Sequence, residues 1–200
     1  DEISKHKHHI RIEHDSNVYL TNDQRKILFS NCKKTFFLTE YHYEYFKQDY
    51  GDIFFNVEIV PDPIDTDVFF DYKTEREDKI LYAGYMHPLK GSYEFFDFVL
   101  QNPNLKFVVS SWTNYLTLDF LCKKIPNVEY IGITDYEKMP AVYNKYSHFY
   151  YNPNLKEPFC RSFAEALLCG CKIISNKCIF ILFKFIFVIV PAQVNKLLCR

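Results

Sequence analysis

The spacing of apolar positions in the first third of the chain alternates between the period of a strand and the period of a helix. This pattern predicts three strands and two helices in the order β-α-β-α-β, over residues 10–13, 22–32, 35–38, 40–50 and 54–60. Asn22 and Thr39 are the expected N-caps, and Gly51 ends the second helix. Strands and helices that alternate at this spacing are typical of a parallel sheet covered by helices.

A second series of the same kind follows a break at residues 61–67. It predicts five strands and four helices, with strands over residues 79–83, 105–110, 128–131, 149–151 and 172–175 and helices over residues 91–101, 115–124, from Asp135 and from about 160–162 to Gly170. In the third of these helices, which starts at Asp135, Met139, Val142, Tyr143 and Tyr146 repeat at helical spacing. In the helix at 91–101, one apolar face is expected to hold Tyr93, Phe96, Val99 and Leu100.

The break itself contains Pro61 and Pro63, which disfavour both a helix and an internal strand. We therefore interpret it as a linker between two α/β domains. Residues 1–66 then form the last part of an N-terminal Rossmann-like domain, and residues 67–176 form most of a second one. The expected fold is α/β with parallel sheets and flanking helices, incomplete at both ends.

Composition narrows the functional classes. A formal net charge of −1 gives no support to a nucleic-acid surface, which needs clustered cations. Seven cysteines form no C-x-x-C pair, and the chain opens on a polar stretch without a signal peptide, so a reduced, cytoplasmic protein is expected. The apolar 48% of the chain suffices for a sizeable core.

The end of the chain, residues 177–200, differs in character. Residues 178–190 are apolar except for Lys184, and no acidic residue occurs after Glu165. This run is short for a bilayer span, which needs roughly 20 apolar residues. Three interpretations stay open: a buried strand and helix, a membrane-associated tail, or non-native sequence. The disagreement between this composition and the rest of the pattern favours the third.

Two carboxylates, Glu157 and Glu165, stand eight positions apart around the expected start of the last helix. Glu157 lies in an irregular segment before Pro158, and Glu165 lies inside the helix. The strand at 172–175 follows directly. An acid in a loop, an acid in the helix after it and a strand directly after that helix are an arrangement by which an α/β sheet presents polar groups at one edge.

The same residues resemble the donor-site signature of the GT-B glycosyltransferases, in particular glycosyltransferase family 4. That signature consists of Glu-Gly-Phe-Gly, several apolar residues, Glu-Ala, a small residue, Gly and then a strand. The chain keeps Glu157, Phe159, Glu165, Ala166 and Gly170. Pro158 and Cys160 replace the two glycines of the family, which let the backbone approach phosphate or sugar closely.

A second stretch, Gly84-Tyr-Met-His-Pro-Leu-Lys90-Gly91, resembles the Gly-Arg-x5-Lys-Gly turn of the same family. A turn from a strand to a helix places amides and a cation beside a diphosphate, so Lys90 can stabilise the leaving nucleoside diphosphate without a metal. Tyr85 stands where the family has an arginine. We expect Arg161, at the start of the Glu165 helix, to supply the missing phosphate contact.

The resemblance implies a role for each remaining site residue. Glu157 would bind hydroxyls of the transferred sugar and Glu165 the ribose hydroxyls, because a carboxylate accepts hydrogen bonds from two hydroxyls. Ile133 would lie beside the nucleobase, while Phe159 and Cys160 would complete the donor loop. His14, within Glu13-His14-Asp15, would face the acceptor.

The resemblance implies transfer of a sugar from a nucleotide-sugar to a carbohydrate, lipid or protein acceptor, with retention of configuration and no metal or other cofactor. Two alternatives stay open: a non-catalytic nucleotide-sugar binder, and another GT-B enzyme such as a nucleotide-sugar epimerase. A third hypothesis takes Asp65-Thr66-Asp67 as the metal-binding D-x-D of the GT-A glycosyltransferases. The surrounding prolines favour the linker, and Val60 to Phe69 resembles the segment that joins the two GT-B domains.

Overall fold

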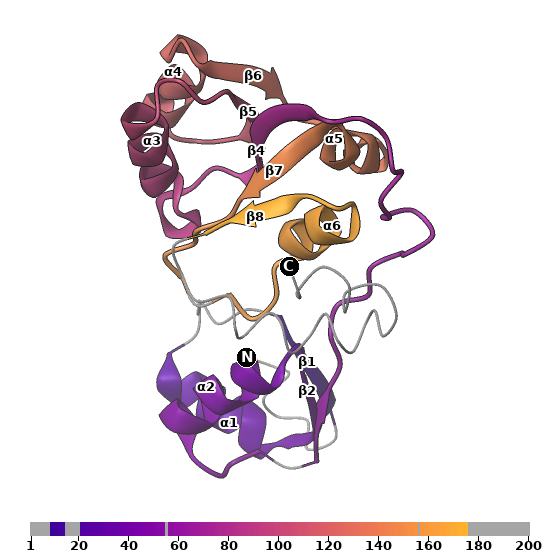
Figure 1. Cartoon of the computed structure of the whole chain (residues 1–200). Coiled ribbons are helices and arrows are strands. Elements are labelled where there is room, and N and C mark those ends of the chain that lie inside the picture. The colour runs from indigo at the N-terminus through magenta and orange to yellow at the C-terminus, as the bar shows by residue number, and fades with distance from the viewer. Residues whose placement is uncertain (1–8, 15–20, 55, 156, 176–200) are drawn as a thin grey trace. The chain divides into compact units, whose positions relative to one another are not determined.

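A computed structural model describes residues 9–14, 21–54, 56–155 and 157–175, which form two compact units (Figure 1). The first unit contains the described residues up to Pro63 together with residues 157–159. The second contains residues 64–155 and the described residues from Cys160 onward. The division between Pro63 and Ile64 falls inside the proline-containing break.

The first unit is a three-stranded parallel sheet with two helices. Its elements are β1 (His9–Glu13), α1 (Asn22–Ser30), β2 (Cys32–Phe37), α2 (Glu40–Tyr50) and β3 (Val57–Ile59). The strands lie in the order β1-β2-β3, and both pairs are parallel. Four buried rings join the helices to the sheet: Phe29, Phe37, Phe46 and Tyr50. The predicted β-α-β-α-β order is confirmed, with β3 shorter than expected.

Side-chain capping sets where the two helices of the first unit begin. Thr21, not Asn22, is the N-cap of α1, so the predicted cap is wrong by one residue. The Thr21 hydroxyl accepts a bond from the Gln24 amide at 3.3 Å, and the Gln24 side chain accepts one from the Thr21 amide at 2.9 Å. This reciprocal pair decides the boundary. Thr39 caps α2 as predicted, by accepting a bond from the His42 amide.

The second unit is a five-stranded parallel sheet in the order β6-β5-β4-β7-β8. The strands are β4 (Glu77–Tyr85), β5 (Phe107–Trp112), β6 (Val128–Gly132), β7 (Tyr146–Tyr150) and β8 (Lys172–Ile174). The α-helices are α3 (Ser92–Gln101), α4 (Leu116–Lys124), α5 (Met139–Lys145) and α6 (Arg161–Leu168), and the 3-10 turns are η2 (Pro88–Lys90) and η3 (Tyr136–Lys138). The predicted α/β fold with parallel sheets is confirmed.

Strand order in this unit creates a reversal next to β4. The chain begins in β4, adds β5 and β6 on one side, and then returns to add β7 and β8 on the other side. In such sheets the connections on the two sides of the first strand diverge, which opens a crevice at the carboxyl ends of the strands. A ligand site is therefore expected near the end of β4.

Two predictions about helix faces and ends in this unit are wrong. The buried face of α3 holds Phe95 as well as Phe96 and Val99, whereas Tyr93 and Leu100 are exposed at 48% and 63%. The aromatic cluster of Phe95 with β4 and β5 rings sets this rotation of the helix. Tyr146 begins β7 instead of continuing α5, because sheet pairing of this residue with Glu77 replaces the helical repeat.

Among the described residues, no helix is long and apolar enough to span a bilayer. The apolar tail at residues 177–200, for which three interpretations stay open, lies outside the described residues.

Candidate functional site

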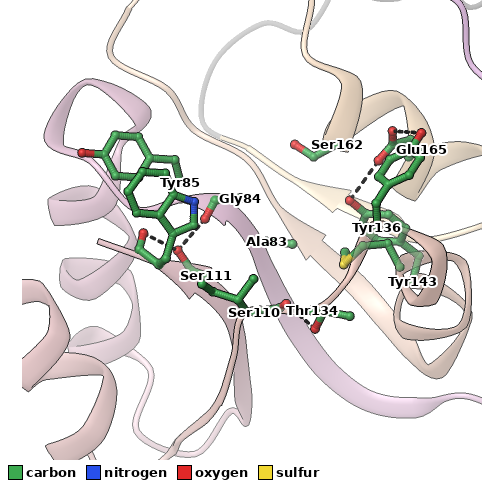
Figure 2. Close-up of a pocket in the computed structure, with 13 residues that line it drawn as sticks. Ala83, Gly84, Tyr85, Ser110, Ser111, Thr134, Tyr136, Tyr143, Ser162 and Glu165 are labelled. Atoms are coloured by element: carbon green, nitrogen blue, oxygen red, sulfur yellow. Dashed lines mark hydrogen bonds between the residues drawn. The ribbon is translucent and has the colours of Figure 1, made fainter. Parts of the chain in front are cut away.

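A pocket of about 240 Å³ lies within the second unit, at the carboxyl ends of β4, β5 and β6 (Figure 2). Helices α5 and α6 complete its wall. The lining residues are Ala83, Gly84, Tyr85, Ser110, Ser111, Trp112, Ile133, Thr134, Tyr136, Met139, Tyr143, Ser162 and Glu165. The pocket therefore lies at the edge of the sheet where the strand order predicts a ligand site.

Gly84 lines this pocket near the end of β4. Its φ of +117° lies in the region that favours glycine, whereas a Cβ added there would make only an ordinary contact, at 4.0 Å, with Ser162 Oγ. The Gly84 carbonyl accepts a hydrogen bond from the Ser111 hydroxyl of the neighbouring strand. Backbone and small polar side chains thus line the centre of the pocket.

Gly91 fixes the turn that follows β4. Its φ is +77°, and a Cβ there would lie 1.9 Å from the carbonyl oxygen of Asn152, so only glycine fits. The Leu89 carbonyl accepts bonds from the amides of Asn154 and Leu155 at 2.9 and 3.0 Å. The turn is therefore held against the segment that follows β7. Lys90 sits at the end of η2, exposed, and is not one of the lining residues.

Glu165 is the charged group of the pocket, and it is 4% exposed. Its two oxygens accept hydrogen bonds from the hydroxyls of Tyr136 at 3.2 Å and Tyr143 at 3.4 Å, as the dashed lines in Figure 2 show. Burial raises the pKa of this carboxyl, and the bonds from Tyr136 and Tyr143 and the charge of Arg161 oppose the rise. Burial also raises the pKa of Tyr143 well above its ordinary value, which keeps this phenol a donor.

Arg161 lies one turn before Glu165 on α6. Its guanidinium donates to the Tyr136 hydroxyl at 2.7 Å, lies 3.7 Å from the Glu165 carboxylate, and stacks over the Tyr136 ring. These contacts make Arg161 a neighbour of the carboxylate at the outer edge of the site. The phosphate contact expected for Arg161 stays a prediction.

Tyr85 packs on another ring at the opposite end of the pocket. Its ring centroid lies 4.2 Å from that of Trp112, and the two planes differ by 27°, which is a stacked pair. Strand pairing explains this contact, because Tyr85 and Trp112 are register partners at the ends of β4 and β5.

The other predicted site residues lie outside this lining. Cys160 is the residue before α6, and its sulfur lies 3.3 Å from Ser162 Oγ. Glu157 and Phe159 group with the first unit, as does His14. The His14 ring is exposed, with Nδ1 3.5 Å from a carboxylate oxygen of Asp62.

Four residues predicted for donor binding line this one pocket: Gly84, Tyr85, Ile133 and Glu165. Sequence reasoning missed the polar and aromatic residues around them, which are Ser110, Ser111, Trp112, Thr134, Tyr136, Tyr143 and Ser162. A usable signal existed for some of them. Ser110 ends a predicted strand, Ser111 and Trp112 follow it, and Thr134 follows another predicted strand; residues at the carboxyl ends of parallel strands meet at one edge.

Two buried cysteines, Cys169 and Cys171, lie on either side of Gly170, between α6 and β8. Like the other cysteines that the structure describes, both carry free thiols. Burial raises the pKa of both thiols to about 12, so neither is a thiolate near neutral pH. The Cys171 thiol donates to the Tyr143 carbonyl, which ties β8 to α5. In the described ranges, no three His, Cys, Asp or Glu side chains gather as a metal site would require.

Asp65 forms a local turn at the start of the second unit. Its carboxylate accepts a bond from the Asp67 amide at 2.9 Å, and its carbonyl accepts one from the Phe69 amide. The D-x-D hypothesis required a GT-A fold, whereas the chain has two separate parallel sheets joined by this segment.

Comparison with solved structures identifies the fold. Sucrose-phosphate synthase from Thermosynechococcus elongatus matches with a TM-score of 0.69 and 14% identity over 83% of this chain and 49% of that one. HepE from Anabaena, solved with UDP and glucose, matches with a TM-score of 0.66 and 14% identity over 83% and 52%. The pneumococcal O-GlcNAc transferase GtfA, solved with UDP and GlcNAc, matches with a TM-score of 0.64 and 14% identity over 84% of this chain and 37% of that one.

These proteins are GT-B glycosyltransferases, and the chain has a partial GT-B type fold. It spans about half the length of the first two and less of the third. No protein-family profile matches the chain. The search of curated proteins also gives no match.

Proposed function

We propose that this chain is the donor-binding part of a nucleotide-sugar glycosyltransferase similar to family 4. The observation that carries the proposal is Glu165, a carboxylate that is 4% exposed yet lines a pocket at the carboxyl edge of a parallel sheet. Its hydrogen-bond donors are the phenols of Tyr136 and Tyr143, and a cation stands only at 3.7 Å. A buried carboxylate costs free energy, so such an arrangement at a pocket indicates binding.

The chemistry of Glu165 suits a vicinal diol. An ionised carboxylate offers about four acceptor positions, and two phenols occupy one on each oxygen. The remaining positions can accept from the two hydroxyls of a ribose. The two tyrosines fix the direction of the carboxylate, so little reorganisation accompanies binding.

The diphosphate of the donor would lie beside the turn that follows β4. Gly84 and Gly91 give this turn its backbone shape, and the bonds from Asn154 and Leu155 hold it in place. Lys90, exposed on the turn, would neutralise the leaving nucleoside diphosphate, which is electrostatic stabilisation without a metal. Arg161 would approach the same anion from the start of α6.

Sugar and acceptor would engage residues of the segment before α6 and of the first unit. In this proposal Glu157 accepts bonds from hydroxyls of the transferred sugar, with Phe159 and Cys160 beside it, and His14 faces the acceptor. Retention of configuration and a hexose as the transferred sugar are parts of the same proposal.

Non-catalytic binding of a nucleotide-sugar is the second candidate, and one observation favours it. Tyr85 occupies the position of the family's phosphate-binding arginine, and its ring is stacked on Trp112. A chain that lacks this cation binds the diphosphate with fewer charge-assisted bonds and stabilises a departing diphosphate less.

Calorimetry against UDP-, GDP- and ADP-glucose tests the binding step. Glu165→Gln and Lys90→Ala are each expected to weaken binding about tenfold to a hundredfold, because each removes a charge-assisted contact of roughly 1.5–3 kcal/mol. Glu137→Gln, an exposed acid next to Tyr136, and Lys124→Ala, an exposed lysine on α4, are the matched controls. Equal affinity in wild type and both site variants would overturn the site.

Release of nucleoside diphosphate separates the two candidates. A transferase releases it faster when a suitable acceptor is present, whereas a binder holds the donor without turnover. The assay uses the donor that binds most tightly and a panel of carbohydrate, lipid and peptide acceptors.

A further inference from the structure

Four aromatic rings gather where β4 and β5 end, outside the main core of the second unit. Tyr85 stacks on Trp112. The centroid of the His87 ring lies 5.4 Å from that of Tyr85 and 5.3 Å from that of Tyr115. Nε2 of His87 lies 3.0 Å from the Tyr115 hydroxyl, and Nδ1 of His87 accepts the Leu89 amide at 3.0 Å. His87 is thus bound at both ring nitrogens, which restrains the cluster.

This cluster leaves a large aromatic surface accessible. Trp112 is 45% exposed and Tyr115 39% exposed, although an indole gains most when it is fully buried. Trp112 and Tyr85 both line the pocket that contains Glu165. Figure 2 shows Tyr85 at one side of this pocket and Glu165 with Tyr136 and Tyr143 at the other, with Gly84 and Ala83 between them.

The two ends of the pocket therefore offer different chemistry. The Glu165 end offers acceptors for hydroxyl groups, and the Tyr85 end offers flat rings. A nucleoside has the same two halves, because a ribose diol is joined to a planar base. Ile133, which follows β6, is 71% exposed and also lines the pocket, next to the strand that carries Trp112.

We propose that the Tyr85–Trp112 pair is the stacking surface for the base of the donor nucleotide, with Trp112 as the contact residue. The proposal rests on the proposed function and deepens it. A base stacked on the exposed part of the indole would place its ribose toward Glu165. Stacking accepts every base because each has a π-face, so the pair gives affinity for purine and pyrimidine nucleotides alike.

Polar groups beside the pair then provide the choice among bases. Ser110 and Thr134 line the same pocket, and their hydroxyls are joined at 2.7 Å. A hydroxyl pair can donate and accept at the edge of a base. In this proposal the aromatic pair contributes the affinity for any base, and the hydroxyls of Ser110 and Thr134 distinguish one base from another.

The chain offers a direct optical test, because Trp112 is its single tryptophan. Titration of the full chain with UDP, ADP and ribose 5-phosphate, followed by tryptophan emission, reports contact with the indole. Saturable quenching is expected with UDP and with ADP, at concentrations that match calorimetric binding. Ribose 5-phosphate, which carries sugar and phosphate but no base, is expected to leave the emission unchanged.

Variants test the same contact without the probe. Trp112→Leu is expected to weaken UDP and ADP binding about tenfold to a hundredfold, the range for loss of one base–aromatic stack. Trp112→Phe keeps a ring and is expected to retain most of the affinity. Phe120→Leu removes an exposed ring on α4 that does not line the pocket and is the control.

The outcomes separate this proposal from the proposed function. If UDP binds the wild type by calorimetry without quenching, and Trp112→Leu binds it equally well, the stacking surface is wrong and the donor site stands. If ribose 5-phosphate quenches as UDP does, the indole contacts sugar or phosphate, and the proposal is again wrong. If no nucleotide binds the wild type, both proposals fail. An equal loss in Trp112→Phe and Trp112→Leu with unchanged urea midpoints also contradicts stacking.

Discussion

Among the described residues, each of the two units buries one carboxylate, and the two are satisfied in different ways. Glu13, at the end of β1, is 5% exposed and lies 2.6 Å from Arg11 and 3.7 Å from Arg25. Glu165, on α6, is 4% exposed, and its bonded donors are the neutral hydroxyls of Tyr136 and Tyr143.

The cations make Glu13 part of the framework of the first unit. Arg25 is itself buried, and its guanidinium stacks over Phe46 at 4.8 Å, inside the ring cluster that holds the helices to the sheet. Arg11 stacks over Phe29 in the same cluster. Charge at Glu13 is thus matched by charge within the core.

Charge at Glu165 is balanced less completely. Arg161 is half exposed and stands 3.7 Å away, and burial raises the pKa of the carboxyl. A buried acid with spare acceptor capacity beside a pocket is suited to take up a ligand, whereas an acid held by arginines is suited to hold a fold. The partners of a buried carboxylate, not its burial, therefore distinguish an acid that stabilises a fold from one that is suited to bind a ligand.

The largest expected effect concerns the turn that follows β4 in the second unit. Gly91→Ala combines a positive φ with a Cβ 1.9 Å from the Asn152 carbonyl oxygen, so the free energy of unfolding should fall by about 3 kcal/mol or more. Gly132→Ala, with a φ of +74° and nothing within 4 Å, is the control and should lose about 1 kcal/mol. Urea denaturation measures both. Equal losses would show that backbone strain alone, not the close approach, limits this turn.

The next prediction tests the two carboxylates against each other. Glu13→Gln should lower the free energy of unfolding by about 3 kcal/mol, because it removes the charge that balances buried Arg25. Glu165→Gln should change it by less than about 1 kcal/mol, since an amide oxygen can still accept from a phenol. The measurement is the urea midpoint of each variant at pH 7. A larger loss at Glu165 than at Glu13 would reverse the assignment of roles.

The smallest effect is the pH dependence of stability. Folding raises the pKa of Glu165 above its ordinary value of 4.5, so the folded state favours the protonated acid. Relative to Glu165→Gln, the wild type should therefore lose stability as the pH rises from about 4.5 to the folded pKa and stay level above it. A pKa difference of one corresponds to about 1.4 kcal/mol.

Thermal or urea unfolding of both proteins between pH 4 and 8 measures this difference. Stability of the wild type that instead grows with pH, relative to the variant, would mean that the charge of Arg161 outweighs the effect of burial on the Glu165 carboxyl.

Local sequence predicted the elements well where a capping residue or a glycine defines them. Thr39 begins α2 because its side chain caps a backbone amide, and Gly51 ends it with a positive φ. Gly91 precedes α3, also with a positive φ, which glycine adopts most readily. The predicted N-cap of α1, Asn22, was wrong, because the capping box of Thr21 with Gln24 places the cap one residue earlier.

Packing against other elements overruled local spacing elsewhere. Tyr93, Phe96, Val99 and Leu100 share helical spacing, yet α3 is rotated so that Phe95 meets the rings of the sheet. A small rotation of the helix about its axis leaves its backbone hydrogen bonds intact. The rotation that brings Phe95 onto the sheet buries more apolar surface, so packing decides which face is buried.

The sequence alone determined the order of strands and helices, the glycines of the turns and the presence of Glu165 inside a helix near a strand. Tertiary structure decided what surrounds that acid. Tyr136 and Tyr143 carry no local mark of function, and they line one pocket with Glu165 and Trp112 only because β6, β5, β4 and β7 lie in that order. Strand order depends on long-range pairing and on the crossovers, so residues distant in the chain reach one sheet edge only after folding.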